Sequence, residues 1–112
     1  MKRPLAYISA PWEGSAVENT EQAMRYCRIV YEAGYAPICP VLFLPLFLHD
    51  SIPQEHKDGI DMGRDLLRRS RVLVVCGELV TEAMKNDIAI AQRLGITATT
   101  LAGILTVKGQ GR

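Results

Sequence analysis

The sequence predicts an α/β fold in which helices cover both faces of an open, mostly parallel sheet. Short apolar runs typical of strands alternate along the chain with amphipathic helical patterns. The run Val72–Cys76 is continuously apolar and rich in β-branched residues, as expected of a parallel strand buried on both faces. With right-handed crossovers, this alternation gives a single small three-layer α/β/α domain of the flavodoxin or Rossmann type, with strand order 2-1-3-4.

The first strand is expected at Pro4–Ser9, and a loop follows it. Ser15 has a glutamate three residues later, Glu18, and this pair is the pattern of a capping box, which predicts that a helix begins here. Apolar residues recur at helical spacing through residues 16–33, and Gly34 is a typical helix terminator. The chain should therefore enter its second strand directly after this glycine.

The second strand is predicted at Tyr35–Cys39, and an apolar segment interrupted by prolines follows it. Because proline disrupts helices, residues 41–53 are expected to form a long loop or a short broken helix. A second amphipathic helix is predicted over Gln54–Ser70. Its interior Gly59 and Gly63 would each weaken it by about 1 kcal/mol, so they indicate close packing or a kink.

The second half of the chain repeats the alternation. After the third strand at Val72–Cys76, a helix is predicted to begin at Val80 or Thr81 and to continue through Leu94. A fourth strand is expected at Ile96–Leu101. These elements complete the predicted sheet.

Length and charge limit the organisation and the partners. The chain has 112 residues, of which 48% are hydrophobic, and a chain of this size buries roughly two thirds of its unfolded surface. We expect one domain at residues 1–106 and a flexible tail at 107–112. The formal net charge of +1 provides no basic excess, so neither nucleic acid nor an anionic membrane is an expected partner.

Cysteine usage and hydropathy predict a cytoplasmic protein. Cys27, Cys39 and Cys76 are odd in number and far apart in sequence, which is typical of a reducing compartment. The most apolar window, Val41–Leu48, is far shorter than the roughly 20 residues that cross a bilayer, and the N-terminus has no apolar stretch typical of a signal peptide. No cysteine or histidine spacing suggests a metal site, and no cofactor is expected.

The fold predicts where a ligand would bind. In open α/β sheets, ligands bind beyond the carboxyl ends of the strands, near the switch in strand order. This rule singles out the segments Ser9–Ser15, Pro40–Asp50 and Gly77–Thr81. The chain has neither a GxGxxG nor a GxxxxGK[ST] motif, so neither a dinucleotide fingerprint nor a Walker P-loop is expected.

Two stretches of the chain resemble a known family. The motifs, in order, are Tyr7-Ile-Ser-Ala-Pro-Trp12, Asn19, Gly34-Tyr-Ala-Pro-Ile-Cys-Pro40, Gly59-Ile-Asp-Met-Gly63, Gly77, Thr81-Glu-Ala-Met84 and Asp87-Ile88. Together they resemble a bacterial and phage family of unknown function in the nucleoside 2-deoxyribosyltransferase-like superfamily. The resemblance covers roughly residues 5–100.

This resemblance implies a chemistry and a set of site residues. Enzymes of the superfamily cleave the N-glycosidic bond of a nucleoside or nucleotide, with a nucleophilic glutamate assisted by a tyrosine of the first strand. Asp87 stands at the position of the glutamate and Tyr7 at that of the tyrosine, so both are candidate catalytic residues. The candidate ligand contacts are Ser9, Pro11, Trp12, Asn19, Gly77, Thr81 and Met84.

The chain departs from the superfamily at the nucleophile position. The carboxylate of Asp87 is one methylene shorter than that of glutamate, which retracts it by about 1.5 Å. Because reacting atoms must approach to about 3–3.5 Å, this retraction matters. An ordinary solvated helix acid is the structural alternative for Asp87.

Three functional hypotheses follow. The first is a protein that binds a nucleoside, nucleotide or related ribosyl ligand and acts on its N-glycosidic bond as a transferase or hydrolase. The second is a non-catalytic protein that senses or sequesters a nucleotide-derived signal. The third is a homo-oligomeric interaction protein without a small ligand.

The segment Val41–Leu48 bears on assembly. It contains six leucine or phenylalanine residues in eight positions, and Pro45 prevents a continuous helix. Closed homo-oligomers commonly bury such apolar patches. We expect a homodimer or higher oligomer with Leu44, Leu46 and Phe47 at or near the interface, the alternative being that the segment forms a lid over the ligand crevice.

Overall fold

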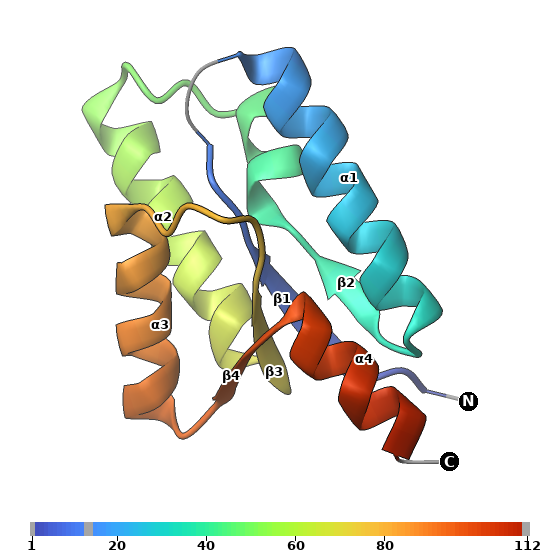
Figure 1. The fold of residues 1–112 in the computed structure, drawn as a ribbon. Coiled ribbons are helices and arrows are strands. Elements are labelled where there is room, and N and C mark those ends of the chain that lie inside the picture. Colours follow the sequence, from blue (N-terminus) through green and yellow to red (C-terminus); the bar gives the residue numbers. More distant parts are fainter. Residues whose placement is uncertain (1, 13–14, 111–112) are drawn as a thin grey trace.

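The fold is built on a four-stranded, all-parallel sheet in the order β2-β1-β3-β4, which confirms the predicted topology (Figure 1). The computed structural model describes residues 2–12 and 15–110, and their side chains through residue 105. The strands are β1 Leu5–Ser9, β2 Ala36–Ile38, β3 Val72–Val75 and β4 Thr97–Thr100. The helices are α1 Ala16–Glu32, α2 Pro53–Arg68, α3 Glu82–Leu94 and α4 Leu101–Gln110, and two short 3₁₀ helices are η1 Pro40–Leu42 and η2 Leu44–Leu46.

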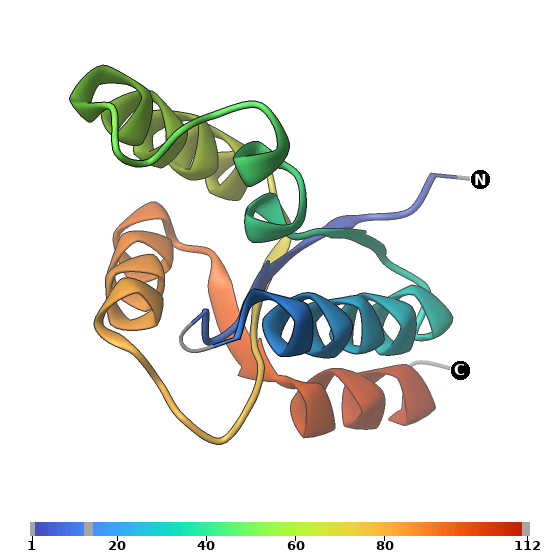
Figure 2. The ribbon, with the colours of Figure 1, turned by 90° about the horizontal axis from the view of Figure 1, so that it is seen from above.

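Helices cover both faces of the sheet, as a parallel sheet requires (Figure 2). On one face, β1 and β3 pack against α1 and α4, with Ile8 and Ile104 among the fully buried residues. On the other face they pack against α2 and α3, where Leu67 and Leu73 are buried. The three-layer α/β/α architecture expected from the sequence is therefore the architecture of the domain.

The start of α1 shows one of the two hydrogen bonds of the predicted capping box. The hydroxyl of Ser15 accepts a hydrogen bond from the backbone N–H of Glu18, at 3.4 Å. The turn after α1 contains Gly34, whose φ of +101° lies in the region that glycine adopts readily. The capping residue and the glycine thus fix both ends of α1, as the sequence predicts.

Helix α2 is continuous through both of its glycines, so they mark close packing and not a break in the helix. A Cβ atom at Gly59 would lie 3.5 Å from the side chain of Leu48. A Cβ atom at Gly63 would lie 3.5 Å from the hydroxyl of Tyr7. The small residues allow α2 to lie close to the strand and to the segment before it.

The segment at residues 41–53 contains two 3₁₀ turns, η1 and η2, which is the broken-helix alternative of the sequence analysis. Pro40 begins η1 and Pro45 lies in the first turn of η2, where proline needs no intrahelical N–H partner. Phe43 lies between the two turns with a non-helical φ of −125°, which separates them. This segment brings η1 to the carboxyl edge of the sheet.

Helix α4 was not predicted by the sequence analysis, which extended the fourth strand through Leu101 and assigned residues 107–112 to a flexible tail. The backbone is helical through Gln110, and residues 111–112 lie outside the described part of the chain. Residues 101–110 contain two glycines, and their polar residues form no amphipathic pattern. The helix-start signal is a threonine inside an expected strand. The hydroxyl of Thr100 accepts a hydrogen bond from the N–H of Gly103 at 3.1 Å and so caps α4.

Over the described residues, none of the helices combines the length and apolar character needed to span a bilayer.

We predict that α4 contributes substantially to stability. Ile104 is 1% exposed, so the Ile104→Ala substitution should lower the free energy of unfolding by about 2–5 kcal/mol, because it removes buried methyl groups and leaves a cavity. Its neighbour Leu105 is 47% exposed, and Leu105→Ala should change stability by only about 0.5 kcal/mol. Urea unfolding of both variants measures the difference, and equal effects would show that α4 is not docked.

Candidate functional site

A cavity of about 250 Å³ lies at the carboxyl end of β1, between η1 and the first half of α3. This is the edge at which the sequence analysis expected a ligand. The residues that line it are Tyr7, Ile8, Ser9, Ala10, Trp12, Pro40, Val41, Thr81, Glu82, Ala83, Met84 and Asp87. The cavity brings together residues from β1 and from α3, which are separated by most of the chain.

The central polar contact of the cavity joins β1 to α3. The hydroxyl of Ser9 donates a hydrogen bond to Oδ2 of Asp87 at 2.9 Å. Tyr7 and Ser9 are two residues apart on β1, so both side chains face the same side of the sheet as α3. The two candidate catalytic residues, Tyr7 and Asp87, therefore lie on one face and line one cavity.

Burial changes the protonation of both candidate catalytic groups. Loss of hydration raises the pKa of Asp87, and the hydrogen bond from Ser9 opposes part of that rise. The pKa of Tyr7 is raised well above its ordinary value, first by burial and then by the nearby charge of Asp87. Tyr7 is thus a neutral phenol over the physiological pH range, suited to donating a hydrogen bond and not to acting as a phenolate base.

The start of α3 forms one wall of the cavity. The hydroxyl of Thr81 accepts a hydrogen bond from the backbone N–H of Met84 at 3.3 Å, which caps the helix. The sulfur of Met84 in turn accepts one from the N–H of Thr81 at 3.5 Å. These contacts hold the first turn rigidly and place Asp87, one turn further along, beside Ser9.

Opposite α3, the cavity wall is apolar. Trp12 is half-buried and packs against the same core cluster as Val41. Pro40 and Val41 of η1 complete this wall. The cavity therefore has a polar side built around Asp87 and an apolar side with an aromatic ring.

Three of the predicted ligand contacts lie outside the lining of this cavity: Pro11, Asn19 and Gly77. Gly77 has a φ of +88°, and a Cβ atom added to it would lie 3.0 Å from the ring of Pro11. The close packing of these two residues shapes the turn after β3. Asn19 belongs to α1, where its N–H bonds to the carbonyl of Ser15 at 3.0 Å in the first helical turn.

Several lining residues were not among the predicted site residues. Pro40 and Val41 lie in a segment that the carboxyl-edge rule does single out, although no motif marked them individually. Glu82 and Ala83 line the cavity through their place in the first turn of α3. The carboxylate of Glu82 in the first helical turn fits the ordinary preference for acids at helix N-termini, and no motif marks either residue as part of a site.

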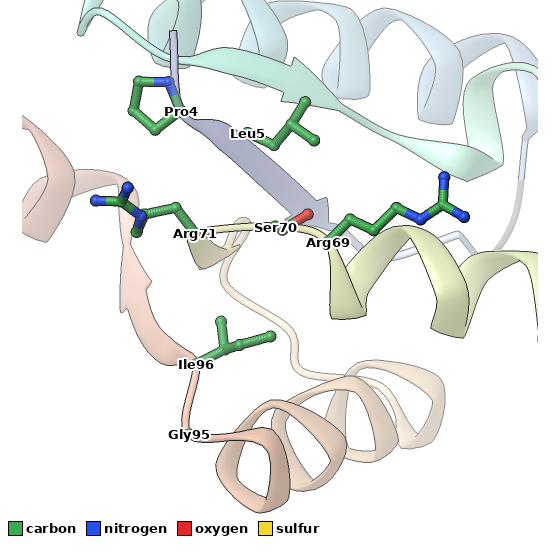
Figure 3. A pocket seen from close by; sticks show the side chains of 7 residues that line it. All are labelled: Pro4, Leu5, Arg69, Ser70, Arg71, Gly95 and Ile96. Carbon is green, nitrogen blue, oxygen red and sulfur yellow. The ribbon is translucent and has the colours of Figure 1, made fainter.

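A second, larger cavity of about 390 Å³ lies at the opposite edge of the sheet (Figure 3). Its two arginines, Arg69 and Arg71, point away from each other, and Arg69 is paired with Asp65 at 3.0 Å. The hydroxyl of Ser70 donates to the carbonyl of Leu66 at 2.9 Å. Because its polar groups diverge or are already paired, this cavity offers no convergent binding chemistry.

No group of three His, Cys, Asp or Glu side chains is placed to hold a metal ion in the portion of the chain that the structure describes.

The fold and the cavity define a class: a small parallel α/β protein with a carboxylate–hydroxyl pair at the carboxyl edge of its central strands. The chain belongs to the family called Domain of unknown function (DUF7768), whose sequence profile matches residues 4–101. All residues that line the cavity fall within this match. No curated protein matches the chain.

We predict that Asp87 lowers stability when it is charged. The pKa of Asp87 is higher in the folded protein than in the unfolded chain. The protonated side chain therefore stabilises the fold below the ordinary aspartate pKa of about 3.9, and this stabilisation is lost as pH rises through the raised pKa. The side chain of Asp87→Asn does not ionise, and its amide oxygen can still accept the hydrogen bond from Ser9. The stability of the variant relative to the wild type should therefore increase as pH rises between roughly pH 3 and pH 7.

Urea unfolding across this pH range measures the effect. Asp61→Asn, at an exposed position of the neighbouring helix α2, is the matched control and should follow the wild type. A gap between Asp87→Asn and wild type that stays constant with pH would contradict the prediction.

Proposed function

We propose that the cavity at the carboxyl end of β1 binds a nucleoside, nucleotide or related ribosyl ligand. The observation that carries this proposal is the hydrogen-bonded pair of Ser9 and Asp87, which shares one cavity with the phenol of Tyr7 and the indole of Trp12. Carboxylate and hydroxyl groups suit the hydroxyls of a sugar, and an indole ring suits the face of a base. The resemblance of the chain to the nucleoside 2-deoxyribosyltransferase-like superfamily supports the same ligand class.

The size of the cavity favours a small ligand. Its volume of about 250 Å³ lies just below the roughly 300–1,000 Å³ typical of small-molecule sites. A nucleoside or mononucleotide fits this scale better than a dinucleotide. The lack of a dinucleotide fingerprint agrees with this choice.

The proposed reaction is cleavage of the N-glycosidic bond, with Asp87 as nucleophile. A carboxylate oxygen of Asp87 would bond to the anomeric carbon while the carbon–nitrogen bond breaks and its electron pair leaves with the base, which takes up a proton. Water or a second base would then attack the anomeric carbon of the glycosyl–enzyme ester, which frees Asp87, and the proton that the attacking group releases balances the one taken up by the leaving base. Tyr7, as a neutral hydrogen-bond donor, would orient the carboxylate or the sugar.

A non-catalytic binder is the second candidate, and the Ser9 contact favours it. Oδ2 of the short Asp87 side chain is already engaged by Ser9, which holds the carboxylate back toward β1. In that role Asp87 accepts hydrogen bonds from the ligand and makes no covalent bond. The catalytic and the non-catalytic function use the same cavity, and they differ in whether the bound ligand is cleaved.

Binding and turnover are tested separately. Titration calorimetry with deoxynucleosides, ribonucleosides and their 5′-monophosphates should detect binding, and Asp87→Asn should weaken it by about 10-fold to 100-fold because a hydrogen bond to a charged group is lost. Asp61→Asn should bind as the wild type does. If no member of the panel binds, the proposed ligand class is wrong.

Chromatography of the same mixtures with an acceptor base should detect free base, and Asp87→Ala should abolish its release. Base release that survives Asp87→Ala would remove Asp87 from the mechanism. Binding without any base release would establish the non-catalytic candidate.

The proposal also includes assembly into a homodimer or higher oligomer. Leu46 is 82% exposed and Phe47 is 56% exposed, whereas Leu44 is half-buried. Neither Leu46 nor Phe47 lines the cavity, although Val41 in the same segment does. The two exposed side chains therefore favour an interface over a lid.

Light scattering at micromolar concentration should give a mass of at least twice 12.4 kDa. Phe47→Asp should dissociate the assembly, because a charge at a buried apolar contact is strongly unfavourable. Leu79→Asp, at a 58% exposed position after β3, is the control and should leave the mass unchanged. A wild-type mass of one chain would contradict the proposal.

A further inference from the structure

The polar groups that line the cavity at the carboxyl end of β1 are not all paired with one another. Tyr7, Ser9 and Asp87 all lie in its wall, and one hydrogen bond joins members of this set, from the hydroxyl of Ser9 to Oδ2 of Asp87 at 2.9 Å. Among the described residues, none is hydrogen-bonded to the phenolic oxygen of Tyr7 or to Oδ1 of Asp87. The wall therefore carries one free donor and one free acceptor.

The free donor belongs to a residue that is otherwise buried. Tyr7 is 8% exposed, and burial keeps its phenol neutral by raising the pKa, so the oxygen carries a proton that it can donate. No side-chain polar atom in the described part of the chain is both sealed from solvent and unpaired. The unpaired phenolic oxygen is therefore accessible, on a side chain that lines the cavity.

The free acceptor is held in place by Ser9. Ser9 is 3% exposed, and the single proton of its hydroxyl is donated to Oδ2 of Asp87. As long as this bond stands, Ser9 cannot donate to a ligand. It restricts the rotation of the Asp87 carboxylate, whose other oxygen, Oδ1, remains able to accept a hydrogen bond.

We propose that Tyr7 and Asp87 together recognise one sugar hydroxyl of the ligand, and that Ser9 is a positioning residue that holds Asp87 for this contact. The inference rests on the proposed ligand class and names the group within it that the site selects. A hydroxyl suits both partners, because it donates its proton to a carboxylate oxygen and accepts one from a phenol. A carbonyl or ether oxygen pairs with Tyr7 alone and leaves the carboxylate without a donor.

The two residues of β1 then have different roles, although both side chains face α3. Tyr7 contacts the ligand directly, whereas Ser9 acts through Asp87. A change at Tyr7 should therefore affect only ligands that carry the recognised hydroxyl. A change at Ser9 should alter Asp87 even without a ligand.

Ligand analogues identify the hydroxyl. The probes for titration calorimetry are the four ribonucleosides and their 5′-monophosphates, each beside its 2′-deoxy and 3′-deoxy analogues, and the nucleosides also beside their 5′-deoxy analogues. Loss of one hydroxyl should weaken binding to the wild type by about 10-fold to 100-fold, because the phenol and the carboxylate both lose their partner. Loss of either other hydroxyl should have a much smaller effect.

A variant that lacks the phenolic oxygen tests the contact itself. Tyr7→Phe keeps the ring and should weaken binding of the intact ligand by about 3-fold to 10-fold. It should leave binding of the sensitive deoxy analogue unchanged, because that analogue has already lost the contact. Tyr31→Phe, at an exposed position of α1, is the matched control and should bind the whole panel as the wild type does.

The role of Ser9 is tested without a ligand, by NMR titration of the carboxyl carbon of Asp87. Ser9→Ala should raise the pKa of Asp87, because the hydrogen bond that favours the carboxylate is lost, and Ser9→Thr should restore it. Ser70→Ala removes an equally buried serine that bonds to the carbonyl of Leu66, and it should leave this pKa unchanged. Tyr7→Phe should not raise it either.

The outcomes separate this inference from the proposed function. If the panel binds but no single hydroxyl dominates, or if Tyr7→Phe weakens the sensitive analogue as much as the intact ligand, the inference is wrong and the ligand class stands. If Tyr7→Phe raises the pKa of Asp87 as Ser9→Ala does, the phenol holds the carboxylate and the assignment of roles is wrong. If nothing in the panel binds, the proposed function and the inference fail together.

Discussion

The parallel pairing of β1 with β3 is the constraint on which the rest of the molecule depends. Both strands lie in the middle of the sheet, with β2 and β4 at its edges. Helices pack against both faces of these two strands. Alternate residues of β1 therefore serve different tasks. Ala6 and Ile8 fill the core under α1 and α4, while Tyr7 and Ser9 face α3 on the other side. A shift of one residue in this register would exchange an apolar core for the polar side of the cavity.

The contact between Ser9 and Asp87 couples this register to α3. Ser9 is one of the few buried polar side chains among the described residues, and its hydroxyl has a defined acceptor at 2.9 Å. Burial of a hydroxyl is tolerated because the hydrogen bond compensates for the loss of water. The same contact restricts the carboxylate of Asp87 to one side of the cavity. A polar interaction thus contributes both to the placement of α3 and to the chemistry available at the carboxyl edge.

Sequence patterns predicted the sheet order and most elements because each has a local signal. These signals lie among residues that are adjacent in sequence. They are the capping residue at the start of α1, the glycine after that helix and the uniformly apolar run of β3. The carboxyl-edge rule and the family resemblance likewise placed Tyr7, Ser9 and Asp87 near one another, and the three residues line one cavity. These residues are far apart in sequence, and the fold supplies their proximity.

The features that sequence reasoning missed depend on tertiary packing. Helix α4 has no amphipathic pattern, and it is defined by the burial of Ile104 and by the cap at Thr100. Glu82 and Ala83 reach the cavity only because α3 begins at its rim. Pro11 and Gly77, both predicted ligand contacts, pack closely together outside the cavity lining. Local patterns carry no information on such contacts.

The glycine at position 63 acts on the cavity from a helix that contributes none of its lining residues. A Cβ atom there would already be in van der Waals contact with the phenolic oxygen of Tyr7, so any side chain longer than that of alanine would compete with this oxygen for space. The absence of a side chain at Gly63 therefore leaves the space that the phenol of Tyr7 occupies. In an alignment of related chains, the size of the residue at this position would report whether the tyrosine keeps its freedom to meet a ligand.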